Sequence, residues 1–266
     1  MTRSRYHVRE GIVVRRTPLP SGDVVVTLLS ADGKWRAVAR KGRRLGGNPG
    51  RLSLFHDVEV QAYRRRDDDL AVVTQVRLSG ALSRLTDPAI YPYAHLLAEL
   101  AERLAVDVHV GEPLHAWLAS GLRGLDRDED PERVALVHSW MLLRVAGFAP
   151  SVAPPGDGRR DDRGDDRADE GGTARTGDRF DVAGGRIAAD GPGTALSGGA
   201  AHGLRLLTVG RARAALADPL PDRPTLWRAL ARYVAWHVAE LHSLEALAPG
   251  ATRNVRPDPV PTGAGA

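Results

Sequence analysis

Seven cationic side chains gather within residues 34–51, and no carboxylate follows them until Asp57. They are Lys34, Arg36, Arg40, Lys41, Arg43, Arg44 and Arg51. Cations crowded this closely repel one another, which costs stability unless an anionic partner screens them. Nucleic acid is the obvious partner, because Lys and Arg contacts to phosphate dominate the affinity of nucleic-acid binders. A solvated basic loop is the alternative that charge alone leaves open.

Other residue types that could do chemistry do not form a recognisable site. The chain has no cysteine, which removes disulfides, thiolate catalysis and thiolate metal ligands. His237 and His242 are five residues apart, so they do not share a helix face. His95, His138 and His237 are expected to be hydrogen-bonded core histidines. The acidic run 67–69 follows the basic run 64–66, and we interpret the two as a self-neutralised, solvated turn. The sequence therefore favours a binding protein over an enzyme, and we expect no metal site and no cofactor.

Charge is distributed unevenly over the 266 residues. Residues 1–80 hold 16 Lys/Arg and 8 Asp/Glu, a net of +8, whereas the remainder holds 21 and 25, a net of −4. The positive field is therefore concentrated in the first third of the chain. No apolar run approaches the roughly 20 residues needed to span a bilayer, and the N-terminus lacks a signal-peptide core. We expect no membrane association and a cytoplasmic location.

The basic residues lie on a region that predicts strands. We expect strands at 8–16, 23–29, 34–41, 55–63 and 70–78, because these runs are β-branched or alternate in polarity. In the third strand Arg36 and Arg40 share one face, while Trp35, Ala37 and Ala39 share the other. Five short strands with a long loop after the third suit a small closed barrel. An OB-fold is such a barrel, and an SH3-like barrel fits nearly as well.

Two aromatic residues of this region, Trp35 and Tyr63, could in principle stack on bases. Trp35 alternates with the arginines, so we expect it to fill the barrel. Tyr63 is the better candidate to stack on a base, although packing explains it equally well.

From residue 81 the pattern becomes helical, which predicts an α+β protein. Start signals at 86–88, 112–113 and 130–131 open three helices, and the third is apolar on most sides. The division that we expect is a nucleic-acid-binding barrel (1–80), a helical domain in two parts (81–150 and 203–250), an intervening segment (151–202) and a flexible tail (251–266).

Composition changes sharply within the intervening segment. Asp, Arg, Gly and Ala dominate residues 153–178, so we expect them to be disordered. Residues 180–187 predict a short hairpin. Residues 222–224 are expected to cap a long final helix, with Leu226, Leu230, Val234, Leu241 and Leu244 among those on one buried face.

Residues 22–44 and 52–55, followed by the helical middle and the Leu-His-Ser-Leu segment at 241–244, resemble the RecO family of bacterial DNA repair proteins. The resemblance covers nearly the whole chain. It implies an N-terminal OB-fold, a helical body and a small zinc-finger-like insert. It also implies DNA binding, annealing of complementary strands, help in loading recombinase, and RecR and single-strand-binding protein as partners.

The insert departs from the family pattern. Many members carry four zinc-binding cysteines around a Phe…Gly-Gly segment, which survives here at 180–185. The ligand positions fall near Glu170, Thr173, Ala189 and Pro192, and one Glu cannot make a tetrahedral site. The insert is therefore expected to be degenerate and free of zinc.

The reading that we favour is a non-enzymatic recombination mediator that binds single- and double-stranded DNA, associated with the nucleoid. An RNA-binding OB-fold protein of translation or RNA processing is the main alternative. An interaction scaffold whose basic loop binds an acidic protein tail is the second. A nuclease is disfavoured, because the sequence lacks clustered carboxylates.

Overall fold

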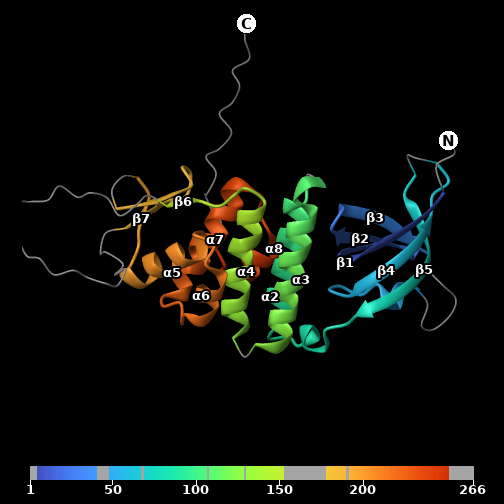
Figure 1. Cartoon of the computed structure of the whole chain (residues 1–266), viewed down its shortest axis with the longest axis horizontal. Coiled ribbons are helices and arrows are strands. Elements are labelled where there is room, and N and C mark those ends of the chain that lie inside the picture. Colours follow the sequence, from blue (N-terminus) through green and yellow to red (C-terminus); the bar gives the residue numbers. More distant parts are fainter. Residues whose placement is uncertain are drawn as a thin grey trace, which may run out of the picture. The chain divides into compact units, whose positions relative to one another are not determined.

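The computed structural model of the chain describes residues 5–40, 48–66, 69–106, 108–128, 130–152, 178–189 and 192–251. The chain divides into two compact units, an N-terminal unit of Met1–Phe148 and a C-terminal unit of Ala149–Ala266. Figure 1 labels most of the helices and strands of the two units.

The N-terminal unit begins with a closed barrel of five strands, as predicted. These strands are β1 (Tyr6–Pro18), β2 (Val24–Ser30), β3 (Gly33–Ala39), β4 (Asp57–Tyr63) and β5 (Ala71–Gly80). Their order around the barrel is β1-β2-β3-β5-β4, and β4 returns to pair with β1. All pairs are antiparallel except β3 with β5, which is parallel. A five-stranded barrel of this kind is compatible with an OB-fold.

Small and β-branched side chains fill the barrel. Val13, Val26, Leu28, Val58 and Val60 belong to its buried core, together with alanines from β3, β4 and β5. The single-turn helix α1 (Asn48–Arg51) precedes Leu52, which is also fully buried in this core. Trp35 packs against the same core, which confirms that it fills the barrel.

Part of the barrel wall is buried on its outer side as well. Ile12, Val14 and Leu29 are buried although they lie outside the barrel core, at places where β1 and β2 pack against helices α2 (Tyr91–Leu104) and α3 (Gly111–Arg127). Gly111, the first residue of α3, allows this helix to approach the start of β3 closely. A Cβ atom there would lie 2.5 Å from the amide nitrogen of Gly33, so only glycine fits at this junction.

Helix α4 (Pro131–Val145) is the buried helix of this unit. Every residue from Val134 to Leu143 is buried, as the apolar sequence predicted. Asp130 caps the helix by accepting a hydrogen bond from the Arg133 amide at 3.1 Å. The predicted start of α2 at 86–88 is wrong by several residues. The Asp87 carboxylate accepts a hydrogen bond from the Ala89 amide within a turn, and the helix begins at Tyr91.

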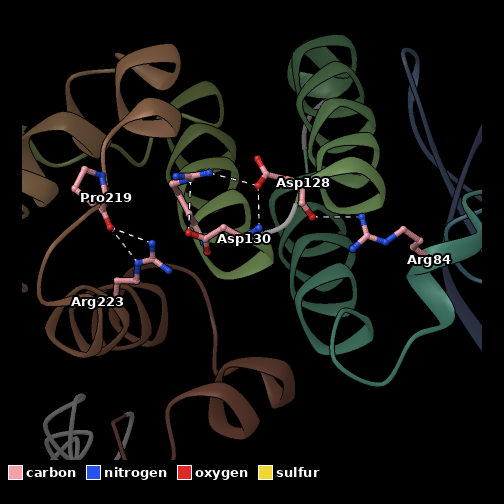
Figure 2. Close-up of polar contacts among 6 residues, drawn as sticks. Arg84, Asp128, Asp130, Pro219 and Arg223 are labelled. Carbon is pink, nitrogen blue, oxygen red and sulfur yellow. Dashed lines mark hydrogen bonds and ion pairs between the residues drawn. The ribbon is translucent and has the colours of Figure 1, made fainter.

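Polar contacts hold the connection between α3 and α4. One of the residues involved, Arg84, comes from the short 3-10 helix at Ser83–Thr86, which precedes α2 in the chain. Arg84 donates to the backbone oxygen of Asp126 at 3.0 Å and to that of Asp128 at 3.4 Å. The Asp128 carboxylate accepts from the Asp130 amide at 2.8 Å and from Arg133 at 3.4 Å (Figure 2). The carbonyl groups at the C-terminal end of α3 are therefore satisfied by an arginine, as helix ends require.

The C-terminal unit combines a small sheet with four helices. The sheet has the order β6-β8-β7-β9, and its strands are β6 (Ser151–Val152), β7 (Arg179–Asp181), β8 (Arg186–Ala188) and β9 (Thr194–Ala195). The helices are α5 (Gly198–Thr208), α6 (Ala212–Ala217), α7 (Arg223–His237) and α8 (His242–Leu247). β7 and β8 form the predicted hairpin, in which Phe180 lies opposite Ile187 and both are buried.

Two predicted boundaries within and at the end of the segment 151–202 are wrong. Asp178, the last residue of the predicted disordered run, is 3% exposed and accepts a hydrogen bond from Arg205 at 2.7 Å. Helix α5 begins at Gly198, inside the segment 151–202, because Ser197 caps it by accepting from the Ala200 amide. The remainder of the predicted disordered run, 153–177, lies outside the described residues, as does the tail from 252 onward.

The predicted long final helix is two helices. α7 ends at His237, and the chain is extended at Leu241 before α8 begins. Leu226, Leu230, Val234, Leu241 and Leu244 are all buried, so the predicted face is correct even though the helix is interrupted. Asp222 does not cap α7 with its side chain, which instead accepts from the Ser197 hydroxyl at 2.5 Å.

Replacing Leu230, which is fully buried on α7, with alanine should lower the free energy of unfolding by roughly 2–5 kcal/mol through lost transfer energy and a cavity. Arg232→Ala on the exposed side of the same helix is the matched control, with an expected change within about 0.5 kcal/mol. Denaturant unfolding of both variants measures this, and equal costs would contradict the assigned face.

His138 should make the protein acid-sensitive. Burial lowers the pKa of His138, whose Nδ1 lies 2.8 Å from the Val134 carbonyl oxygen. Below about pH 6.5 the unfolded chain takes up a proton that the native state resists, so stability falls as the pH falls. Unfolding free energies between pH 7.5 and 5 should therefore decline less steeply for His138→Gln than for the parent. His115, whose pKa burial also lowers, should leave a residual slope.

Candidate nucleic-acid interface

Strand β3 sets the direction of the predicted cationic residues. Ala37 and Ala39 are buried in the barrel core, whereas Lys34, Arg36 and Arg40 are exposed, as the alternation predicted. A strand advances about 3.3 Å per residue, so Lys34 and Arg40 lie roughly 20 Å apart along it. The side chains at the two ends of β3 therefore contact different parts of the unit.

Lys34 lies at the end of β3 that is close to helix α2. Its Nζ donates to the backbone oxygen of Glu102 at 3.1 Å, in the last turn of α2. Arg15 forms an ion pair with the carboxylate of the same Glu102 at 3.5 Å. A cation at a helix C-terminus is favourable, so Lys34 has a structural contact that the sequence did not indicate.

Arg51 also has a structural contact. Its guanidinium donates to the backbone oxygen of Val76 on β5 at 2.9 Å, and its own carbonyl oxygen lies 3.0 Å from Nδ1 of His56. These bonds attach α1 to the barrel. Lys41, Arg43 and Arg44 lie outside the described residues, so the structure places neither them nor their contacts.

Arg40 and Tyr63 come together at the opposite end of the barrel. Both line one cavity of about 680 Å³, here called the tyrosine cavity. Its lining residues are Tyr6, Arg40, Tyr63, Arg65, Asp69, Leu70, Val72 and Thr74. Tyr6 is 68% exposed, and its ring centroid lies 5.3 Å from that of Tyr63 at an interplanar angle of 57°. The cavity thus combines an exposed aromatic pair with cationic side chains.

Cations outnumber carboxylates around this cavity within the described residues. Arg65 lines it with Arg40, Arg66 is exposed nearby in sequence, and Asp69 is the one described carboxylate in the lining. Arg65, Arg66 and Asp69 are exposed, and no ion pair joins residues 64–66 to Asp69 among the described residues. The self-neutralised turn at 64–69 stays a prediction. Asp67 and Asp68 lie outside the described residues.

The sequence alone does not indicate Tyr6 or Arg65 as site residues. Tyr6 joins the cavity because β1 pairs with β4 in a register that sets Tyr6 opposite Tyr63. That register links residues 57 positions apart, and the local pattern around Tyr6 carries no sign of it. Arg65 is cationic, but the three aspartates that follow at 67–69 suggested that its charge is balanced locally, so it was not predicted to contact nucleic acid.

Metal binding finds no support in the described part of the chain. It contains no group of three or more His, Cys, Asp or Glu side chains placed to hold an ion. Ala189 and Pro192, near which the resemblance implies two zinc-ligand positions, are described, and their side chains carry no ligand atom. Among the described helices, none is long and apolar enough to cross a membrane.

A closed five-stranded barrel followed by helices defines an α+β protein whose barrel is compatible with an OB-fold. Comparison with protein families is more specific. The family described as Recombination protein O, N terminal, matches residues 3–82, and Recombination protein O, C terminal, matches residues 85–245. The chain therefore belongs to the Recombination protein O (RecO) family, and this membership supports a role in recombinational DNA repair.

Single substitutions on β3 should separate structural from interface cations. Lys34→Ala should lower the free energy of unfolding by roughly 0.3–1 kcal/mol, because it removes a cation from the end of α2. Arg36→Ala removes the same charge from an exposed position and should leave stability nearly unchanged. For DNA affinity, Arg40→Ala should cost more than Lys34→Ala. If Lys34→Ala weakened DNA binding as much as Arg40→Ala at unchanged stability, the structural role assigned to Lys34 would be wrong.

Proposed function

We propose that the chain is a non-enzymatic recombination mediator that binds single- and double-stranded DNA, anneals complementary strands and assists recombinase loading. The observation that carries the proposal is the meeting of Arg40 and Arg65 with the Tyr6–Tyr63 pair around one cavity. Membership of the RecO family makes DNA the preferred ligand over RNA or an acidic protein tail.

Electrostatics supports a role in annealing. Two DNA strands repel each other through their phosphates, and a cationic surface that contacts both lowers this repulsion. Arg40, which lines the tyrosine cavity, is followed in sequence by Lys41, Arg43 and Arg44. Together they offer phosphate contacts that fix the position of DNA without reading its sequence. No catalytic group is needed for this step.

The family resemblance supplies the proposed partners. We propose that RecR and single-strand-binding protein bind this chain during recombinase loading. The proposed location is cytoplasmic and nucleoid-associated. We assign no surface to either partner.

We further propose that residues 151–202 correspond to the zinc-finger-like insert of the family in a form that lacks the metal. The buried pair Phe180 and Ile187 and the Asp178–Arg205 ion pair support this interpretation, since they hold the small sheet together with protein contacts. Within this interpretation the five-part domain division remains, with the helical part now starting at Gly198.

The decisive test removes the cations at the end of β3. In a variant with Arg40, Lys41, Arg43 and Arg44 replaced by Ala, the slope of log K against log salt should fall by about 2.8 for single strands and about 3.6 for duplex. Annealing should be lost, while sequence preference and melting temperature should be retained.

A matched control replaces Arg159, Arg160, Arg163 and Arg167 with Ala. It removes as many charges from a segment where Asp161, Asp162, Asp165 and Asp166 balance them in sequence. This control should change the salt slope much less. Equal losses in the two quadruple variants would show that net charge alone drives binding and would remove the basis for a site at residues 34–51.

A further inference from the structure

Four adjacent strands bring one residue each into a single row across the outside of the barrel. Tyr6 on β1 lies opposite Tyr63 on β4, and Tyr63 lies opposite Val72 on β5. Val72 in turn lies opposite Val38 on β3, through the parallel pair that closes the barrel. Residues in register point to the same face of a sheet, so these four side chains form one surface, here called the outer row.

The outer row is apolar and accessible. Tyr6 is largely exposed, and the other three side chains are partly exposed. Neighbouring strands lie about 4.8 Å apart, so four strands give the row a length of roughly 14 Å. An accessible apolar strip that contains an exposed aromatic pair can contact a ligand with an apolar face.

Cations flank the row on both sides. Arg40 lies two residues beyond Val38 and Arg65 two beyond Tyr63, and both line the tyrosine cavity. Because β3 runs parallel to β5 whereas β4 runs antiparallel to it, the two arginines lie on opposite sides of the row. Farther along on the Arg40 side, Glu10 lies opposite Glu59, whose carboxylate forms an ion pair with Arg77 at 3.1 Å. An anion that lies over the row can therefore contact a guanidinium group on either side of it.

A nucleotide with an unpaired base fits both properties. Its base is a flat apolar surface that stacks on aromatic rings, and its phosphate is an anion. In a duplex the base faces are buried in the stack, so a duplex can offer phosphates to Arg40 and Arg65 but no base to Tyr6.

Resting on the DNA-binding function proposed above, we propose that the outer row stacks unpaired bases and makes the barrel favour single-stranded over double-stranded DNA of equal charge. Tyr6 is the principal stacking residue, because it is the most exposed aromatic side chain of the row. Pairing of two strands withdraws their bases from Tyr6. The annealed product is therefore held more weakly than its separate strands and is released.

The test compares three probes at one salt concentration: oligo-dT, an abasic oligonucleotide of the same length, and a duplex. The abasic probe keeps the phosphates and lacks the bases. The parent should bind oligo-dT more tightly than the abasic probe. Tyr6→Ala should weaken oligo-dT binding by roughly 5- to 150-fold, the range of one lost stacking contact, and leave the abasic probe and the duplex unchanged.

Controls separate stacking from general damage to the barrel. Tyr6→Phe keeps the ring and should bind like the parent, whereas Tyr6→Leu keeps an apolar side chain without the ring and should bind like Tyr6→Ala. Leu78→Ala removes another exposed apolar side chain of the barrel, 42% exposed on β5, and should change none of the three affinities. Melting temperatures of all variants should match that of the parent.

The outcomes are distinct for the two proposals. If Tyr6→Ala leaves the preference for oligo-dT over the abasic probe intact, the outer row does not stack bases, whatever the arginine variants show. If Arg40→Ala also leaves every affinity unchanged, the DNA-binding site itself is wrong. Tighter binding of oligo-U than of oligo-dT would assign the outer row to RNA and overturn the proposal.

Discussion

The parallel pairing of β3 with β5 is the contact on which the candidate site depends. It joins Ala37 to Ala71 and Val38 to Val72, and it turns a curved sheet into a closed barrel. Parallel pairs are slightly weaker per residue than antiparallel ones, and this one spans few residues. Closure nevertheless removes two sheet edges that would otherwise present unpaired backbone groups. It also brings Arg40, at the end of β3, to the strand pair that carries Tyr6 and Tyr63.

Much of the fold could be predicted from the sequence, because its determinants are local. β-Branched runs marked the five strands, the Asp-Pro pair at 130–131 marked the start of α4, and the alternation on β3 separated Trp35 from the arginines. The candidate site was predicted only in part. The sequence indicates Arg40 and Tyr63 as candidates, but Tyr6 depends on the register between β1 and β4, which arises from packing between distant segments.

Other differences between sequence and structure share this origin. The segment 238–241 contains no glycine or proline, so nothing local indicates that α7 ends before it. Tertiary packing decides, because Leu241 and Leu244 are both buried after the chain changes direction. Lys34 and Arg51, both predicted to contact nucleic acid, also have contacts that the sequence does not indicate. Each donates to a backbone carbonyl, one on α2 and the other on β5.

The burial of β1 on both faces bears on whether the barrel can exist alone. Ile12, Val14 and Leu29 face away from the barrel interior and are covered where β1 and β2 meet α2 and α3. A fragment that ended at residue 80 would expose these side chains to water as a continuous apolar patch, a feature associated with aggregation. We therefore expect the barrel to depend on these helices for its stability. Its independent production, or its transfer to another protein, should require α2 and α3 to accompany it.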